Sequence, residues 1–338
     1  MKNLVKISRI EKAFYEMAKA DLKFQEYFFT YYAQKLIFLN QFYPHIEGTL
    51  TGYTDHGPDH ITRILMLYEK MLKNNISAFE SVDIPSSGNI NFYELYLLLC
   101  ATILHDVGNL LGRFDHPEKA KIIVDKVKNN FFVDDEMKRY ALQMVSAHSG
   151  EDTIKKHIER EDVDYKNEEI NLRFLGAILR FTDELEEGRV RVDRTYYDSI
   201  KDTMDQNQRI FWEISLLINR ITPNPDGFEI EICAEIDEKN LFNLYKKKEK
   251  DVALIDELIF RIDKINNERK YYMEFVRKHL EYREIIFNLT ITSTGNSPIT
   301  ISYKFNNDQG YEKFWKYQTH LNPENHIKDY FLQKGGVA

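Results

Sequence analysis

The stretch FYELYLLLCATILHDVGN, residues 92–109, decides the expected fold. Its first part, Tyr93–Leu104, is apolar nearly all round, which predicts a helix that is buried on every side. The run is about half the ~20 residues that a membrane-spanning helix needs, so we expect it in a globular core. His105 and Asp106 follow at the end of this helix. Burying an imidazole and a carboxylate there is costly without a partner, and a metal ion is one such partner.

The segments around this stretch also favour helices. Apolar residues recur at spacings of three and four from Ile10 to Phe42, and Gly57-Pro58 is typical of a helix start. Further helices are predicted at Pro58–Asn74, Phe92–Leu104, Pro117–Asn129, Asp134–Ala147 and Asn171–Leu185. The turn-forming residues of Ser81–Asn91 predict a loop, and no strand is expected before residue 200. The prediction is a mainly α domain over residues 1–205, with an N-terminal helical extension and a core at about 50–195.

The pattern changes after about residue 208. Ile210–Ile221 and Phe228–Ile236 are rich in β-formers and flank a Pro-Asn-Pro-Asp-Gly turn, which predicts two strands. Lys246–Tyr282 has the pattern of a long helix, and two more strands are expected at Ile285–Ser293 and Ile299–Phe305. We therefore predict a smaller α+β unit of order ββαββ over residues 206–310, followed by a tail at 311–338.

Composition excludes several classes of protein. With 338 residues and 43% hydrophobic content, the chain is long and apolar enough for one large or two ordinary folded domains. The net charge of −8 argues against nucleic acid as a partner, and we expect no membrane association. Two cysteines cannot form a disulfide framework, so a cytoplasmic location is expected. A homo-oligomer is compatible with this composition.

The histidines are unevenly distributed along the chain. Seven of the ten fall between His45 and His157, within the predicted helical half. Aspartates accompany them at Asp106 and Asp183. Imidazole and carboxylate together are the ligands that Mn, Fe, Ni, Co and Zn accept, whereas Ca and Mg prefer oxygen alone. The helical half is therefore the place to expect a transition-metal site.

Five separated motifs extend this expectation. They are HITRI (60–64), ILHDVGN (103–109), HPEKA (116–120), HS (148–149) and LRFTDEL (179–185). In this order they resemble the HD-domain superfamily of metal-dependent phosphohydrolases over roughly residues 50–195. Within it, YTDHGPDH (53–60), LRFTDELE (179–186) and DRT (193–195) look most like the HD-CE-type branch, with likeness also to dNTP triphosphohydrolases.

The resemblance implies a helical bundle with two divalent metal ions of unknown identity, drawn from Mn, Fe, Ni, Co and Zn. His60, His105, Asp106 and Asp183 would hold the first ion. Asp106 would bridge to a second ion that His116 and His148 also hold, because a carboxylate can share its two oxygens between cations. Asp106 is thus also expected to be catalytic.

The role of His56 is open. It lies four residues before His60, but Gly57-Pro58 indicates that the helix starts between the two. A substrate-facing or supporting role is as plausible as ligation, and we count His56 among the expected catalytic residues. Arg63, Arg113, Lys119 and Arg180 are the cations near these motifs, and Lys119, Arg180 and Arg63 are the residues predicted to contact substrate phosphate.

The expected function is hydrolysis of a phosphoester or phosphoanhydride bond of a nucleotide, with a dNTP or a cyclic or linear oligonucleotide as substrate and a metal-activated water as nucleophile. Cyclic di-GMP is disfavoured, because Gly150 is followed by Glu-Asp and not by the Tyr-Pro that accompanies that activity. Two alternatives stay open. One is a catalytically silent nucleotide sensor or complex subunit, and the other is a di-iron oxygenase, which uses a similar set of ligands.

Overall fold

The computed structural model describes residues 7–49, 54–73, 76, 90–127, 132–248, 250–277 and 280–305. The chain divides into two compact units. The first comprises Met1–Thr51, Asp55–Glu186 and Glu274–Glu281, and the second comprises Gly52–Thr54, Glu187–Met273 and Tyr282–Ala338. The division after Glu186 falls earlier than the expected boundary at residue 205. The predicted tail at 311–338 and nearly all of the predicted loop at 81–91 lie outside the described residues.

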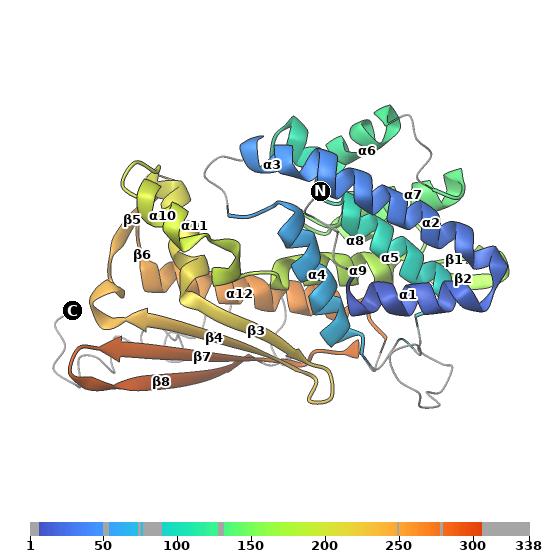
Figure 1. The fold of residues 1–338 in the computed structure, drawn as a ribbon. Helices are drawn as coiled ribbons and strands as arrows, with labels where there is room; N and C mark the ends of the chain where they lie inside the picture. The colour runs from blue at the N-terminus through green and yellow to red at the C-terminus, as the bar shows by residue number, and fades with distance from the viewer. Residues whose placement is uncertain are drawn as a thin grey trace. The chain divides into compact units, whose positions relative to one another are not determined.

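The first unit is a bundle of helices (Figure 1). Its α-helices are α1 (Arg9–Ala20), α2 (Leu22–Ile37), α3 (Tyr43–Thr49), α4 (Pro58–Met71), α5 (Phe92–Leu104), α6 (His116–Lys126), α7 (Asp135–Ala147), α8 (Thr153–His157) and α9 (Leu172–Leu185). A π-helical turn, η1 (Phe38–Phe42), joins α2 to α3, and a 3-10 turn, η3 (Val107–Leu111), follows α5. The mainly α class predicted for this half is confirmed.

Helix α5 forms the centre of this bundle. Every residue from Phe92 to Leu104 is buried, and α5 packs against α2, α7 and α9. Within the described residues, one stretch, Phe92–Leu111, is long and apolar enough to cross a membrane by length and composition, but 89% of it is buried inside the structure. This burial is typical of the core helix that the sequence predicts.

Side-chain caps set where the key helices begin. Asn91 and Glu94 form a capping box at the start of α5, and Asp134 and Asn171 accept backbone N–H bonds at the starts of α7 and α9. Pro58 occupies the first turn of α4, where its missing N–H costs nothing. These starts agree with the predicted helices to within a residue.

The helical unit also contains a short hairpin that the sequence analysis missed. Strands β1 (Asp162–Tyr165) and β2 (Glu168–Asn171) pair antiparallel across Lys166 and Asn167, both of which have positive φ. Each strand has only four residues and mostly acidic side chains, so its alternation is weak. The expectation of no strand before residue 200 is therefore wrong.

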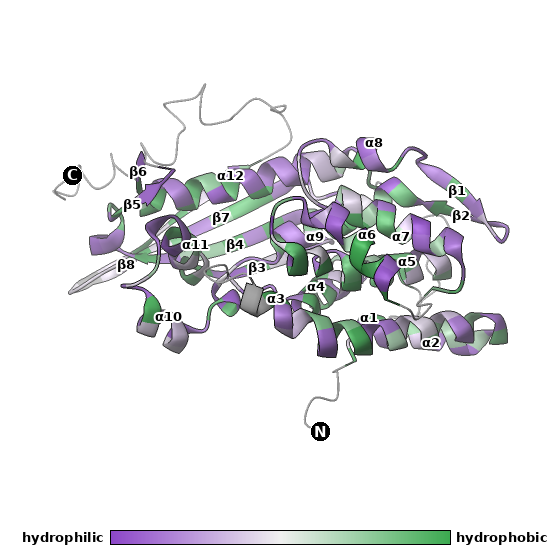
Figure 2. Ribbon diagram, turned by 90° about the horizontal axis from the view of Figure 1, so that it is seen from above, coloured by the Kyte–Doolittle hydropathy of each residue, from purple (hydrophilic) through white to green (hydrophobic). Residues whose placement is uncertain are grey.

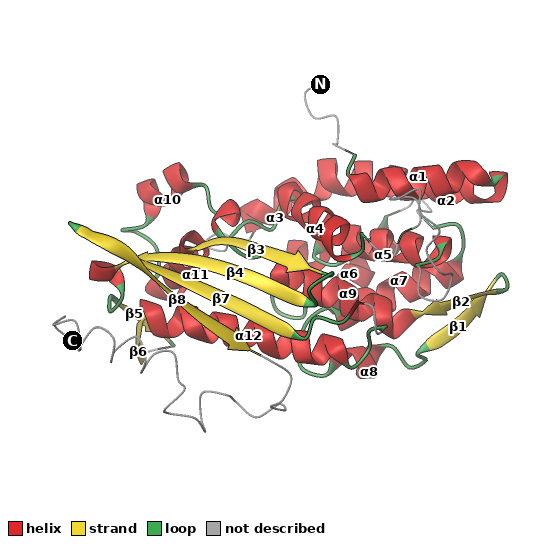
Figure 3. Ribbon diagram, turned by 90° about the horizontal axis from the view of Figure 1, so that it is seen from below, coloured by secondary structure: helices red, strands yellow, loops and turns green. Residues whose placement is uncertain are grey.

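The second unit is built on a four-stranded sheet of order β3-β4-β7-β8 (Figure 3). Its strands are β3 (Ile218–Asn224), β4 (Glu229–Asp237), β7 (Glu284–Ser293) and β8 (Asn296–Phe305). Two antiparallel pairs meet through the parallel pair β4–β7, and α12 (Leu254–Met273) lies along one face. Hydrophobic and hydrophilic residues alternate along β4 and β7 (Figure 2), as a sheet covered on one face requires. The predicted α+β character is confirmed.

Two element predictions in this unit are wrong. The predicted strand at 210–221 is mostly helix α11 (Gln206–Leu217), which follows the short helix α10 (Arg194–Ile200), and β3 begins only at Ile218. A short run that is apolar at most positions has no period that separates a strand from a buried helix.

The long helix predicted from Lys246 to Tyr282 is shorter at both ends. Its first eight residues form most of the hairpin of β5 (Leu244–Lys247) and β6 (Lys250–Ala253), and α12 ends at Met273. The lysine-rich run is thus an exposed hairpin and not the start of a helix. Charged residues without Pro or Gly carry little information on this choice.

Candidate metal centre

The six predicted ligands all lie at or near helix ends in the first unit. His60 is in the first turn of α4, His116 begins α6, and Asp183 is in the last turn of α9. His105 and His148 occupy the C-cap positions of α5 and α7, and Asp106 follows His105. Residues from five helices are thereby brought to one place.

The first group of donor atoms consists of His60, His105 and Asp183, with Oδ2 of Asp106. His60 Nε2 lies 3.2 Å from His105 Nε2 and 3.2 Å from Asp183 Oδ1. Asp106 Oδ2 lies 3.7 Å from His60 Nε2 and 3.6 Å from His105 Nε2. Four donor atoms therefore face a common point.

The second group consists of His116 and His148, with Oδ1 of Asp106. The two Nε2 atoms are 3.1 Å apart, and Asp106 Oδ1 lies 3.2 Å from that of His116 and 4.0 Å from that of His148. Asp106 is 4% exposed, and its two oxygens face different groups. This is the arrangement that a bridging carboxylate requires.

The donor set fits a transition metal. Ligands that share an ion at about 2.1 Å lie roughly 3.0–3.4 Å from one another, close to most of the distances within each group. Donor atoms of His60, His105 and Asp183, and of His105, Asp106 and His148, lie within 4.8 Å of each other. The C-terminal ends of α5, α7 and α9 also converge here, and their partial negative charge favours a cation. These residues could hold metal; the number of ions and the element are separate questions.

The two aspartates are held in their charged form. Burial alone would raise the pKa of Asp106, but His105, His116 and Arg113 outweigh it and bring the pKa well below its usual range. Burial likewise opposes ionisation of Asp183, and the bonds from His105 and His60 lower its pKa. Both carboxylates are therefore ready to bind a cation at neutral pH.

The histidines differ in protonation. Burial would lower the pKa of His60, but Glu186 and Asp183 outweigh it and raise the pKa to about 9. Burial and the neighbouring His105 and His116 lower the pKa of His148 to about 3. Without metal, His60 therefore carries a proton at neutral pH while His148 presents a lone pair. Metal binding would release the proton of His60.

His56 lies beside the first group. Its ring stacks on that of His60 with centroids 5.7 Å apart, and the residue is 8% exposed. It is outside the two clusters of donor atoms, and its charge acts on Asp106. This position suits a residue that faces substrate or supports the ligands, and the catalytic role stays a prediction.

The three cations predicted to bind substrate are engaged in contacts with the protein. Arg63 bonds Glu186 through Nε and Asp55 through Nη2 (2.7 Å). Arg180 is buried and donates to Thr153 Oγ1 at 2.7 Å. Lys119 donates to the Leu111 carbonyl at 3.0 Å. These contacts support the surrounding structure, and contact with substrate stays a prediction for all three.

Other residues near the centre were not assigned roles from the sequence. Asn109 Nδ2 donates to Asp106 Oδ1 at 2.8 Å, and Glu186 Oε2 lies 2.7 Å from His60 Nδ1. Each follows an aspartate ligand by three residues, which places it on the same helical face, and this spacing was the available signal. Arg113, which the sequence analysis named but did not favour, has Nη1 3.6 Å from Asp106 Oδ1 and a side chain that is 42% exposed.

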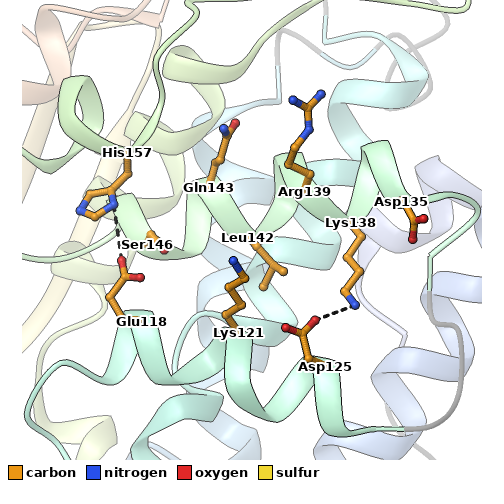
Figure 4. A pocket seen from close by; sticks show the side chains of 10 residues that line it. All are labelled: Glu118, Lys121, Asp125, Asp135, Lys138, Arg139, Leu142, Gln143, Ser146 and His157. Atoms are coloured by element: carbon orange, nitrogen blue, oxygen red, sulfur yellow. Dashed lines mark ion pairs between the residues drawn. The ribbon is translucent and has the colours of Figure 1, made fainter.

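A separate hollow of about 400 Å³ runs along α6 and α7 (Figure 4). Its charged residues largely pair among themselves, with Lys138 on Asp125 at 2.8 Å and His157 on Glu118 at 3.4 Å. None of the six predicted ligands lines this hollow. It is therefore distinct from the metal centre.

A helical bundle that gathers histidines and aspartates in the order H…HD…H…H…D defines an HD-type domain. The profile of the HD-CE family matches residues 50–264, more than half of the chain, and the protein belongs to this family. The match extends beyond the helical unit into α12. Comparison with curated proteins and with solved structures found no match to this chain.

Proposed function

We propose that the protein is a metal-dependent phosphohydrolase that cleaves a phosphoester or phosphoanhydride bond of a nucleotide. The observation that carries the proposal is the buried Asp106 carboxylate, whose two oxygens face two separate groups of imidazoles. Two divalent ions held there would supply a water of lowered pKa and neutralise phosphate oxygens.

The residues around the two groups support phosphate chemistry. Asp106 and Asp183 stay ionised, so the site is prepared for cations without further proton loss from carboxylates. Arg113 presents a partly exposed guanidinium beside Asp106 and is suited to bind an anionic substrate. His56 lies against His60 and is placed to exchange a proton with a group bound there.

The setting of the proposal follows from the chain as a whole. We propose a cytoplasmic enzyme, because the one membrane-length stretch found in the described residues is a buried core helix. A nucleotide is the expected partner, and the acidic balance of 54 acidic against 46 basic residues argues against nucleic acid. A homo-oligomer is compatible with these features.

The test is a screen of metals against nucleotides with identification of products. Purified protein loaded with Mn, Fe, Ni, Co or Zn is incubated with dNTPs and with cyclic and linear oligonucleotides, with Asp106→Ala in parallel. We expect phosphate, pyrophosphate, triphosphate or a mononucleotide to be released by the wild type, and only background release by the variant. No turnover in any combination would contradict the proposal, and a nucleotide that raises Tm without being consumed would favour a sensor instead.

A further inference from the structure

The four histidines of the metal centre are supported in two different ways. The Nδ1 atoms of His105, His116 and His148 each bond the main-chain carbonyl three residues earlier, of Thr102 (2.9 Å), Arg113 (3.1 Å) and Val145 (2.6 Å). His60 differs, because its Nδ1 lies 2.7 Å from the Glu186 carboxylate. Three imidazoles are thus backed by neutral peptide groups and one by a charged side chain.

Glu186 is itself held firmly. The residue is 3% exposed, and one carboxylate oxygen contacts His60 while the other accepts a bond from Arg63 Nε. Arg63 in turn pairs with Asp55 at 2.7 Å. Both oxygens of Glu186 are therefore occupied, and the carboxylate has one orientation behind the imidazole.

A carboxylate behind a ligand histidine has two physical effects. It keeps the proton on Nδ1, which leaves the Nε2 lone pair for the metal, and its negative charge makes the imidazole a stronger donor. A peptide carbonyl has the first effect but carries no net charge. The metal position that His60 serves should therefore bind a cation more strongly than one served by His116 and His148.

The charges on the two sides of Asp106 add to this difference. The first group includes Asp183 and has Glu186 behind it, whereas the guanidinium of Arg113 lies 3.6 Å from the oxygen that serves the second group. A fixed positive charge at this distance opposes a second cation. Both observations point in the same direction and come from different residues.

We infer that Glu186 is a positioning residue that acts through His60, and that the first group consequently binds its metal ion more tightly and fills before the second. The inference rests on the proposed function in one respect, since both groups must bind metal. It adds an order of binding and assigns Glu186 a role that the ligand motif does not contain.

Titration of the metal-free full-length protein with Mn²⁺ alone tests this inference. Calorimetry or the EPR signal of free Mn²⁺ should show two steps, and His148→Ala should remove the weaker step while keeping the tighter one. Glu186→Gln should weaken the tighter step by about 10- to 100-fold and change the weaker step by less than about threefold. Circular dichroism and Tm establish that each variant is folded.

The separation of the two steps distinguishes positioning from general support, because a loosened structure would weaken both steps alike. If Glu186→Gln does not fold, Glu186→Asp serves instead, since it keeps the charge but withdraws it from Nδ1 and should weaken the same step. Equal affinities in the wild type, equal weakening of both steps, or no weakening would overturn the inference. Two-step binding without any hydrolysis would overturn the proposed function alone, and no Mn²⁺ binding by the wild type would overturn both.

Discussion

At the scale of single residues, Asp106 connects the whole metal centre. Its carboxylate lies within 4.0 Å of the Nε2 atoms of His60, His105, His116 and His148. Asn109 and Arg113 approach it as well. A side chain with one oxygen or none could not face both groups, so this position tolerates no substitute.

Asp106→Ala should therefore lose metal from both groups while the helical unit stays folded. A bound ion stabilises the native state, by about 2.7 kcal/mol at a metal concentration 100 times Kd, so the wild type should show a rise in Tm with metal that the variant lacks. Elemental analysis and thermal unfolding with and without Mn²⁺ measure both effects. The exposed Asp125→Ala on α6 is the matched control, and full metal content in Asp106→Ala would refute the site assignment.

At the scale of elements, the approach of η3 to α6 places His116. A Cβ on Gly108 would lie 1.8 Å from the carbonyl oxygen of His116 and 2.7 Å from the backbone nitrogen of Ala120. These are backbone atoms, so a larger residue could not be accommodated by a side-chain rotation. Only glycine allows the turn after the His-Asp pair to meet the start of α6.

Gly108→Ala should push α6 away and displace His116 from His148. We expect a loss of roughly 2–3 kcal/mol in the free energy of unfolding, at the upper end of the usual cost of overpacking, together with loss of metal from the second group. Urea unfolding and metal analysis measure these changes. Gly295→Ala is the control, because its Cβ would meet nothing within 4 Å and only the positive φ costs energy. Equal stability of Gly108→Ala and wild type would contradict the packing argument.

Glu187 joins elements of the second unit. It pairs with Arg261 of α12 at 2.8 Å and accepts a bond from Ser215 of α11 at 2.7 Å. Burial would raise its pKa, but Arg261 and Arg191 outweigh burial and lower the pKa to about 2. Because the unfolded value is near 4.5, the ionised group stabilises the fold above about pH 4.5, and this contribution is lost as pH falls towards 2.

Glu187→Gln should therefore lower the free energy of unfolding by about 2–3 kcal/mol at pH 7, since each unit of pKa shift corresponds to about 1.4 kcal/mol. The difference from wild type should shrink as pH falls from about 5 to about 2, where both side chains are neutral. Denaturant unfolding across this pH range measures it. Asp198→Asn, which removes an exposed pair on α10, should leave the profile unchanged, and a constant difference at all pH values would exclude this explanation.

At the scale of the whole molecule, the chain returns to the helical unit after α12. Residues Glu274–Glu281 belong to the first unit, although the segments on either side of them belong to the second. In this segment Arg277 Nη2 pairs at 2.7 Å with Glu94, whose side chain is fully buried at the start of α5. The segment therefore supplies the countercharge of a core residue, and residues 1–186 alone would lack it.

Arg277→Leu should destabilise the helical unit by about 2 kcal/mol. Removing one partner of a buried pair costs about 3–5 kcal/mol, but the backbone N–H groups of Asn91 and Asn171 still bond Glu94 and offset part of the loss. Hydrogen exchange of α5 amides and global unfolding measure the effect. Lys155→Met, which breaks an exposed pair with Glu274 of the same segment, should have no measurable effect, and equal effects of the two variants would disprove a special role for the buried pair.

Residue patterns alone predicted the helical half because its signals are local. Caps at Asn91, Asp134 and Asn171 and the all-apolar α5 are encoded within a few residues, so helices and their starts followed from the sequence. Local signals were weaker for α11 and for the β5–β6 hairpin. There, burial and pairing with distant segments decided between helix and strand, and a single short run contains no record of these partners.

The sequence by itself determined which residues carry the chemistry: histidines and aspartates in an order shared with a family of metal-dependent proteins. It did not determine which atoms face each other, because ligands from residue 60 to residue 183 meet only when five helices pack. Tertiary structure alone decided that the two oxygens of Asp106 face different groups and that Arg63 supports Glu186. It also decided that His60 is backed by a carboxylate while the other three histidines are backed by peptides. The physical reason is that a ligand's identity is local chemistry, whereas its orientation and charge depend on groups that folding brings from elsewhere in the chain.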